Sequence, residues 1–152
     1  MTDFPRLIEH AFPLKQASLD SVHEKNVRHG HISTLHIWPA RRPLAACRAA
    51  LIATLLPDPG SPEARRKLCE RIGGRVVRRV ERKRMPDGAV VERVKEETEG
   101  GILHWLGAEP ASASRKKKEE HRRTTKLHER ELEEFRQQIR DAFAGRAPRV
   151  LD

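Results

Sequence analysis

Residues 29–43 hold the densest set of chemically useful side chains in this sequence. They include three histidines, two hydroxyl side chains, one tryptophan and two arginines: His29, His31, Ser33, Thr34, His36, Trp38, Arg41 and Arg42. Loops use arginine forks, hydroxyls and an aromatic face to hold a phosphate, a carboxylate or a base. The same residues fit a purely local role, in which the arginines open a helix, the histidines bond nearby groups and the tryptophan is core. Composition alone leaves both interpretations open.

The three histidines do not predict a metal site. Zinc needs three or four ligands that converge on one point. The spacing of His29, His31 and His36 matches no standard ligand pattern. Cys47 and Cys69 form no Cys-x-x-Cys pair, so we expect two free thiols in a reducing cytoplasm.

The elements that must position this segment are mostly helical. Apolar spacing, prolines and glycines predict short helices over 4–10 and 14–28, a strong apolar helix from Pro43 to Leu56, and another from Ser61 to Gly73. Valines on two charged arms around Pro86-Asp87-Gly88 predict a β-hairpin over 75–96. A last helix is predicted over 129–144. The sequence therefore predicts an α+β, helix-rich fold with one β-hairpin.

Charge favours a polyanionic partner. The formal net charge is +9, and residues 61–152 hold 24 of the 31 Lys and Arg residues. Nucleic acid is the first expectation, because each cation on a phosphate releases counterions. For the basic run 115–123, which is interleaved with Glu, we favour a solvated face. For the run 75–84 the groove-binding and solvated interpretations stay open. No long apolar run predicts a membrane span or a signal peptide, and we expect a cytoplasmic protein with no membrane partner.

The final residues predict the beginning of another domain. Val150, Leu151 and Asp152 follow Pro148, and an apolar pair that runs into Asp is typical of the first parallel strand of an open α/β sheet. In such folds the ligand lies just beyond the carboxyl end of that strand, so Asp152 is a candidate for the strand end beside a cofactor. The chain would then be incomplete at its C-terminus.

Residues 24–49 (EKNVRHGHISTLHIWPARRPLAACRA) resemble the opening of a family of large prokaryotic proteins described as adenine-specific DNA methylases. Their N-terminal module is called domain of unknown function 1156, and it typically reads REKxIRHGHxSTLHxWWARRPLAACR. Pro39 stands where the family has a second Trp, so a stacking role is not carried over to that position. The resemblance continues weakly through the hairpin and returns at residues 99–105 and 135–152.

The resemblance implies a function and a cofactor. In the family, Pro-Arg-Val-Leu-Asp leads into the glycine-rich loop that holds S-adenosylmethionine, and an Asn-Pro-Pro-aromatic catalytic motif lies further on. Neither motif occurs here, so we expect no catalysis and no tight cofactor binding by this chain alone. By analogy with related methyltransferases, His36, Arg41 and Arg42 would face the cofactor or the target nucleotide. Because the target base must leave the stack, a basic module could hold the displaced DNA backbone.

These observations give one preferred reading and two alternatives. The preferred reading is the N-terminal module of an S-adenosylmethionine-dependent, adenine-specific DNA methyltransferase in restriction or phage defence, preceding a Rossmann-like domain. DNA is the expected partner, with the rest of the methylase or other defence proteins as further partners. The first alternative is a stand-alone DNA-binding or protein-interaction module, and the second is a small hydrolase or metal enzyme built on the histidines. The predicted divisions are 1–60 for a helical module, 61–107 for a helix and basic hairpin, 108–128 for a charged linker, and 129–152 for a helix and the first strand of a truncated methyltransferase domain.

Overall fold

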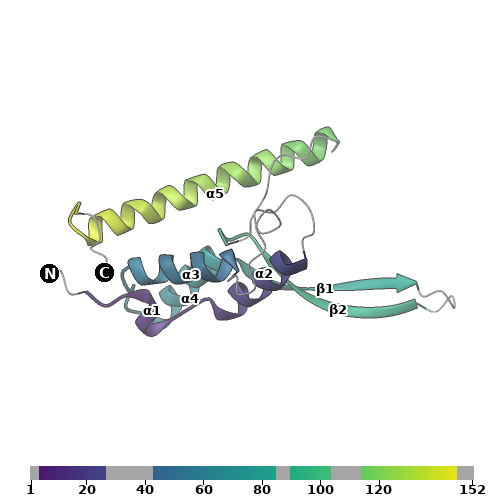
Figure 1. Cartoon of the computed structure of the whole chain (residues 1–152), viewed down its shortest axis with the longest axis horizontal. Helices are drawn as coiled ribbons and strands as arrows, with labels where there is room; N and C mark the ends of the chain where they lie inside the picture. The colour runs from purple at the N-terminus through teal and green to yellow at the C-terminus, as the bar shows by residue number, and fades with distance from the viewer. Residues whose placement is uncertain (1–3, 27–42, 85–89, 104–113, 147–152) are drawn as a thin grey trace.

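The computed structural model describes residues 4–26, 43–84, 90–103 and 114–146, and within these ranges the chain is helix-rich α+β. Five helices and two strands follow in the order α1 (Leu7–His10), α2 (Leu14–Asn26), α3 (Leu44–Leu55), α4 (Pro62–Gly73), β1 (Arg75–Arg84), β2 (Val90–Glu99) and α5 (Arg115–Ala142). Helices α1 to α4 form a compact group, α5 lies across one side of it, and the hairpin extends away from it (Figure 1). The predicted α+β class with one hairpin is confirmed.

Capping chemistry sets the bounds of α4. The Ser61 side chain accepts a hydrogen bond from the Ala64 N–H at 3.2 Å, Pro62 occupies the first turn, and Glu63 places a carboxylate at the positive end of the helix dipole. Gly74 ends the helix with a φ of 82°, a backbone conformation that side chains disfavour. The sequence predicted this helix at both ends.

Helix α3 packs through alanine rather than leucine. Ala45, Ala49 and Ala53 recur every fourth residue and are fully buried, whereas Leu51 is 65% exposed. Small side chains on one face let α2 approach α3 closely. Leu51 therefore lies outside the core, because the face that carries the alanines makes the contact.

The segment before α1 is tied to the turn between α3 and α4. The Leu7 N–H donates to the Leu56 carbonyl at 3.0 Å, and the Asp58 N–H donates to the Pro5 carbonyl at 2.8 Å. Leu7 and Leu56 are both fully buried. These contacts place the start of the described chain against the C-terminal end of α3.

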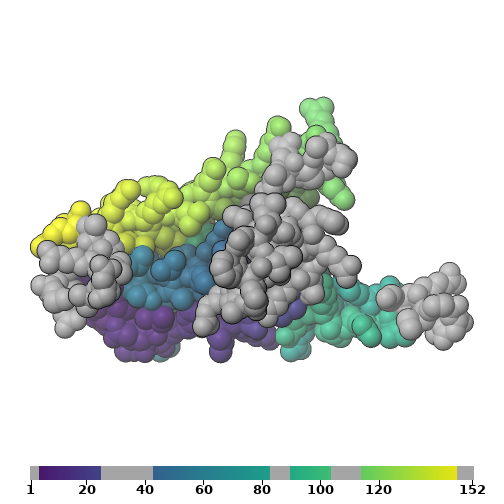
Figure 2. Space-filling view, viewed as in Figure 1, coloured from purple at the N-terminus to yellow at the C-terminus, as the bar shows by residue number. Residues whose placement is uncertain are grey.

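The hairpin is antiparallel and regular along its whole described length. Arg75 pairs with Glu99 at its base, Val80 with Val94 midway and Arg84 with Val90 near its tip. Val80 and Val94 share one face of the ribbon yet are 58% and 68% exposed. In the space-filling view the hairpin stands clear of the helical body (Figure 2). The predicted hairpin over 75–96 is confirmed, with β2 extending three residues further.

Helix α5 begins earlier than the sequence predicted. Residues 115–128 were expected within a charged linker over 108–128, but they form the first half of a 28-residue helix. Lys, Arg and Glu are good helix formers even without an apolar period, and pairs such as Arg123–Glu119 at 2.6 Å add support four residues apart. The end of the helix agrees with prediction, since the Gly145 N–H donates to the Arg140 carbonyl with a φ of 73°.

Helix α5 joins the core through one aromatic residue in its second half. Phe135 is 2% exposed, and the Arg71 guanidinium of α4 lies 4.9 Å from its ring centroid. Arg71 Nη2 also binds Glu131 at 2.6 Å and Glu134 at 2.7 Å. Arg71 thus fixes α5 against α4 by a stacked and a charged contact together.

Residues 100–103, which follow the hairpin, pack onto the end of α4. Ile102 and Leu103 are buried, and the Ile102 N–H donates to the Ile72 carbonyl at 2.8 Å. A β-carbon at Gly101 would lie 2.2 Å from the Gly74 nitrogen. Gly74 and Gly101 therefore let two parts of the backbone pass close to each other at the base of the hairpin. The strand predicted at Val150–Asp152 lies outside the described residues.

The two adjacent glycines at this crossing give a matched test. Gly100 and Gly101 have φ values of +76° and +71°, but a β-carbon at Gly100 would meet nothing within 4 Å. We expect Gly100→Ala to lower the free energy of unfolding by about 1 kcal/mol through backbone strain. Gly101→Ala should cost about 2 kcal/mol more, because its β-carbon collides with backbone. Urea denaturation measures both values, and equal losses would contradict the close crossing.

Candidate functional site

The sequence-predicted site falls between two helices that the structure does describe. The candidate residues all lie in 27–42, outside the described residues: His29, His31, Ser33, Thr34, His36, Trp38, Arg41 and Arg42. Asp152 also lies outside the described residues, at the end of the chain. Helix α2 ends at Asn26 just before this segment, and α3 begins at Leu44 just after it. The contacts between α2 and α3 therefore decide how the ends of the segment are held.

Glu24 binds the first turn of α3 with both carboxylate oxygens. Its Oε2 accepts a hydrogen bond from the Leu44 N–H at 2.8 Å, and its Oε1 accepts one from the Ala45 N–H at 3.0 Å. The Glu24 residue is only 7% exposed. Pro43, the N-cap of α3, supplies no side-chain cap bond. Glu24 thus replaces the missing cap from twenty residues away.

This contact, which we call the Glu24 bracket, is strong for electrostatic reasons. The first N–H groups of a helix have no partner within the helix and carry the positive end of its dipole. A carboxylate that accepts from two of them makes charge-assisted bonds, which are stronger than neutral ones. The bracket therefore holds the last turn of α2 next to the first turn of α3, the two helices that flank residues 27–42.

A second acid on the same face of α2 holds the hairpin. Asp20, one turn before Glu24, is 3% exposed, and its Oδ1 accepts from the Thr98 hydroxyl at 2.5 Å. Lys15, in the first turn of α2, binds Glu96 at 2.9 Å. Helix α2, which carries Glu24, therefore also holds the base of β2.

Sequence reasoning missed both acids, although a pattern pointed to them. Asp20 and Glu24 stand four residues apart and so share a helix face. An apolar helix that opens on Pro43 without a capping side chain needs an acceptor from elsewhere. Together these features predict an acid-to-helix contact, but the sequence does not identify which helix it reaches.

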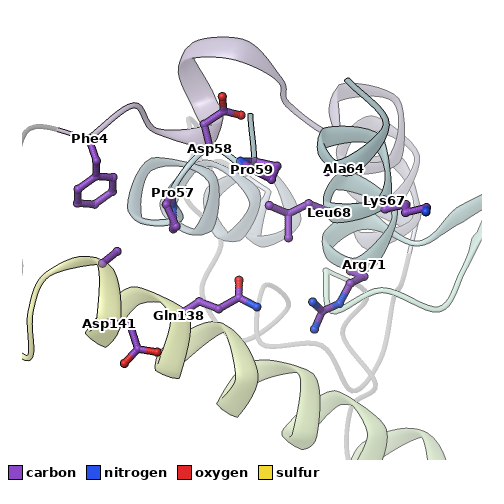
Figure 3. Close-up of a pocket in the computed structure, with 11 residues that line it drawn as sticks. Phe4, Pro57, Asp58, Pro59, Ala64, Lys67, Leu68, Arg71, Gln138 and Asp141 are labelled. Carbon is purple, nitrogen blue, oxygen red and sulfur yellow. The ribbon is translucent and has the colours of Figure 1, made fainter. Parts of the chain in front are cut away.

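A groove lies on another side of the molecule, between α4, the turn at 57–59 and the second half of α5 (Figure 3). Its volume is about 870 Å³, and Arg71 reaches across it from α4 toward α5. Apolar and charged side chains line it together: Phe4, Pro57, Asp58, Pro59, Ala64, Lys67, Leu68, Arg71, Gln138, Asp141 and Ala142.

Of the two carboxylates in this groove, Asp58 forms an internal ion pair. Arg65 Nε donates to Asp58 Oδ1 at 2.7 Å, and Arg65 Nη2 donates to Oδ2 at 2.6 Å. These hydrogen bonds hold the pKa of Asp58 below its ordinary value and raise that of Arg65. A fork-to-fork pair of this kind fixes the turn after α3, and it leaves Asp58 poorly suited to acid–base catalysis.

The remaining chemistry of the described ranges is sparse. Both cysteines are free thiols, as predicted, and burial raises the pKa of Cys69 and makes it a poor nucleophile. Within residues 4–26, 43–84, 90–103 and 114–146, no group of three His, Cys, Asp or Glu residues could hold a metal ion. The predicted histidine cluster lies outside those ranges.

Comparison with known proteins finds a family model that matches part of the chain. Residues 11–71 match the family model described as Protein of unknown function (DUF1156), which supports the resemblance to domain of unknown function 1156. The match contains α2, the segment 27–42, α3 and most of α4. No curated protein and no solved structure matches the chain. In the described part of the chain, no helix is long and apolar enough to cross a membrane.

Removal of the Glu24 bracket should be costly. We expect Glu24→Ala to lower the free energy of unfolding by about 2–3 kcal/mol, because two helix N–H groups lose a charged acceptor. Glu24→Gln should cost less, since its amide oxygen still accepts one bond. Glu129→Ala, at an exposed position of α5, is the matched control and should change stability by less than about 0.5 kcal/mol. Chemical denaturation gives all three values. A loss in Glu24→Ala no larger than the control would contradict the bracket.

The Asp58–Arg65 pair should show itself in the acid dependence of stability. Because the folded pKa of Asp58 lies below its unfolded value of about 3.8, its contribution is complete above that pH and is lost as pH falls through the folded pKa. Asp58→Asn should therefore destabilise the protein at pH 6, and its difference from the unmodified protein should shrink as pH falls below about 3.8. Urea midpoints between pH 6 and pH 2 measure this. A difference independent of pH would contradict the assignment.

Proposed function

We propose that this chain is the N-terminal module of an S-adenosylmethionine-dependent, adenine-specific DNA methyltransferase in restriction or phage defence, and that it binds DNA without catalysing methyl transfer alone. The single observation that carries the proposal is the Glu24 bracket. It lies within the family match over residues 11–71 and closes the base of the segment that carries the resemblance. The bracket supports a role for that segment in holding a ligand rather than in merely connecting α2 to α3.

The side chains in the segment suit DNA better than a small metabolite. Arg41 and Arg42 supply two guanidinium forks for phosphate, Ser33 and Thr34 supply hydroxyls, and Trp38 supplies a face on which a base can stack. The net charge of +9 adds sequence-independent attraction to the duplex. Their role in the proposal is to hold the DNA near the reacting base.

The described residues do not fit S-adenosylmethionine, the methyl donor that the family resemblance implies. A site for such a cofactor in an open α/β sheet needs a glycine-rich turn at the carboxyl end of a parallel strand. The two described strands form an antiparallel hairpin instead. The carboxylate Asp58 in the groove is committed to Arg65. We therefore assign the Rossmann-like domain and the cofactor to sequence beyond this module.

A stand-alone DNA-binding module is the second candidate. The observation that favours it is a core shared by elements throughout the described chain, including Leu7, Ala49, Leu56, Ile72 and Phe135. Such a module would bind DNA equally well without any methyltransferase. Both candidates predict DNA binding, so the coding sequence must separate them.

Reading the coding sequence beyond the codon for Asp152 makes that separation. The methyltransferase proposal expects an in-frame Pro-Phe-Ala-Gly-like loop and, further on, an Asn-Pro-Pro-aromatic motif. A coding sequence with neither motif would contradict it and favour the stand-alone module.

DNA binding by the segment itself is tested by removing two charges. We expect Arg41→Gln/Arg42→Gln to weaken binding to a 20-bp duplex and to lower the slope of log affinity against log salt by about 2, because each lost phosphate contact removes about 0.9. The control is Arg66→Gln/Lys67→Gln, which removes the same charge from exposed positions of α4. Fluorescence anisotropy at several salt concentrations measures both. Equal slopes for the two variants would contradict a specific role for the segment.

A further inference from the structure

The first half of α5 extends beyond the packed part of the molecule. The helix has 28 residues and is therefore about 42 Å long. Its one fully buried side chain is Phe135, and no residue from Arg115 to Arg130 is classed as buried. The green end of α5 projects past the group formed by α1 to α4 (Figure 1). About half of a long helix thus gains little from packing.

This half carries a dense and poorly neutralised positive charge. Residues 115–126 contain seven Lys or Arg and two Glu. In the described part of the chain, Arg123 pairs with Glu119, while Arg115, Lys116, Lys117, Lys118 and Lys126 make no ion pair. A run of cations with so few acidic neighbours in the sequence raises the local positive potential and attracts polyanions.

The hairpin differs, although its sequence is also basic. Arg78 binds Glu96 at 3.1 Å, Arg82 binds Glu92 at 2.7 Å, and Lys95 binds Glu97 at 2.7 Å. Its cations are therefore largely neutralised by carboxylates of the ribbon itself. The contrast reverses the sequence-based preference, which favoured a solvated face for residues 115–123 and left the hairpin open.

The position of these charges on α5 is also unfavourable for an isolated helix. Four consecutive cations, Arg115 to Lys118, occupy its first turn, where the helix dipole is positive, and no acid stands there. Ser114, the N-cap, makes no side-chain cap bond. Helix α4, by contrast, has the acid Glu63 in its first turn and a side-chain cap bond from Ser61. An anion bound along the start of α5 would offset this repulsion.

Four of the cations fall on one face. Arg115, Lys118, Arg122 and Lys126 follow at intervals of three, four and four residues, which returns close to the same angle of the helix. Arg115, Lys118 and Arg122 line one shallow hollow together with Glu119. The set, which we call the α5 stripe, extends over about 16 Å of helix axis, enough to meet several phosphates in succession.

We propose that the α5 stripe binds the phosphate backbone of duplex DNA. This inference rests on the proposed function and names the surface that would grip the DNA outside the segment 27–42. A membrane surface is a poorer fit, because residues 115–126 contain no apolar side chain that could enter the lipid boundary. The charge and length of the stripe match a regular row of phosphates.

A matched pair of full-chain variants tests the stripe. The first is Arg115→Gln/Lys118→Gln/Arg122→Gln/Lys126→Gln. The control is Arg78→Gln/Arg79→Gln/Arg82→Gln/Lys95→Gln, which removes the same formal charge from the hairpin. We expect the stripe variant to lower the salt slope of duplex binding by about 3–4 and the affinity at least about tenfold. The control should change both much less. Because Gln is a good helix former, circular dichroism should show that the stripe variant keeps its helix.

The outcomes separate the stripe from the proposed function. No salt-dependent duplex binding by the unmodified chain would overturn both. Duplex binding that falls only with Arg41→Gln/Arg42→Gln, and not with the stripe variant, would overturn the stripe alone. Equal losses in the stripe and hairpin variants would also overturn it, since net charge would then explain the effect. Binding to anionic phospholipid vesicles, in the absence of duplex binding, would overturn the assignment to DNA.

Discussion

An uncapped helix start is the constraint on which this structure depends. Helix α3 opens on Pro43, which offers no side-chain acceptor, so its first N–H groups must find one elsewhere. The buried carboxylate of Glu24 accepts from two of them. The neighbouring Asp20 binds Thr98 of the hairpin. One face of α2 thereby joins α3 and β2.

This constraint also fixes the two helices that flank residues 27–42. Helix α2 ends at Asn26, two residues after Glu24, and α3 begins at the turn that Glu24 binds. Closing the ends of a loop in advance lowers the entropy that a ligand must remove on binding. The groove beside Asp58 has a different character, because Arg65 and Arg71 are already engaged with acids of the protein. These arginines of the groove thus stabilise the fold through ion pairs within the protein.

Local chemistry made part of this fold predictable from sequence. Ser61-Pro62-Glu63 and Gly74 fixed α4 because capping depends on neighbours in the chain, and the turn residues 86–88 between valine-bearing arms indicated the hairpin. The first half of α5 was not predictable from an apolar period, because it has none and is stabilised by helix propensity and pairs such as Arg123–Glu119. The Glu24 bracket and the Asp20–Thr98 bond join residues 20 and 78 apart, and no local rule names such partners. The predicted site residues themselves lie outside the described ranges, so their roles stay predictions.

The central claim is that the bracketed segment and the start of α5 hold the same DNA. Photo-cross-linking to a duplex with 5-iodouracil at successive positions, followed by mass-spectrometric mapping of the attached peptides, tests it most directly. We predict cross-links within residues 27–42 that are lost in the Glu24→Ala variant. We also predict cross-links within residues 115–126 that are lost in the stripe variant. Cross-links confined to the groove around Lys67 and Arg71, or to the hairpin alone, would contradict the claim.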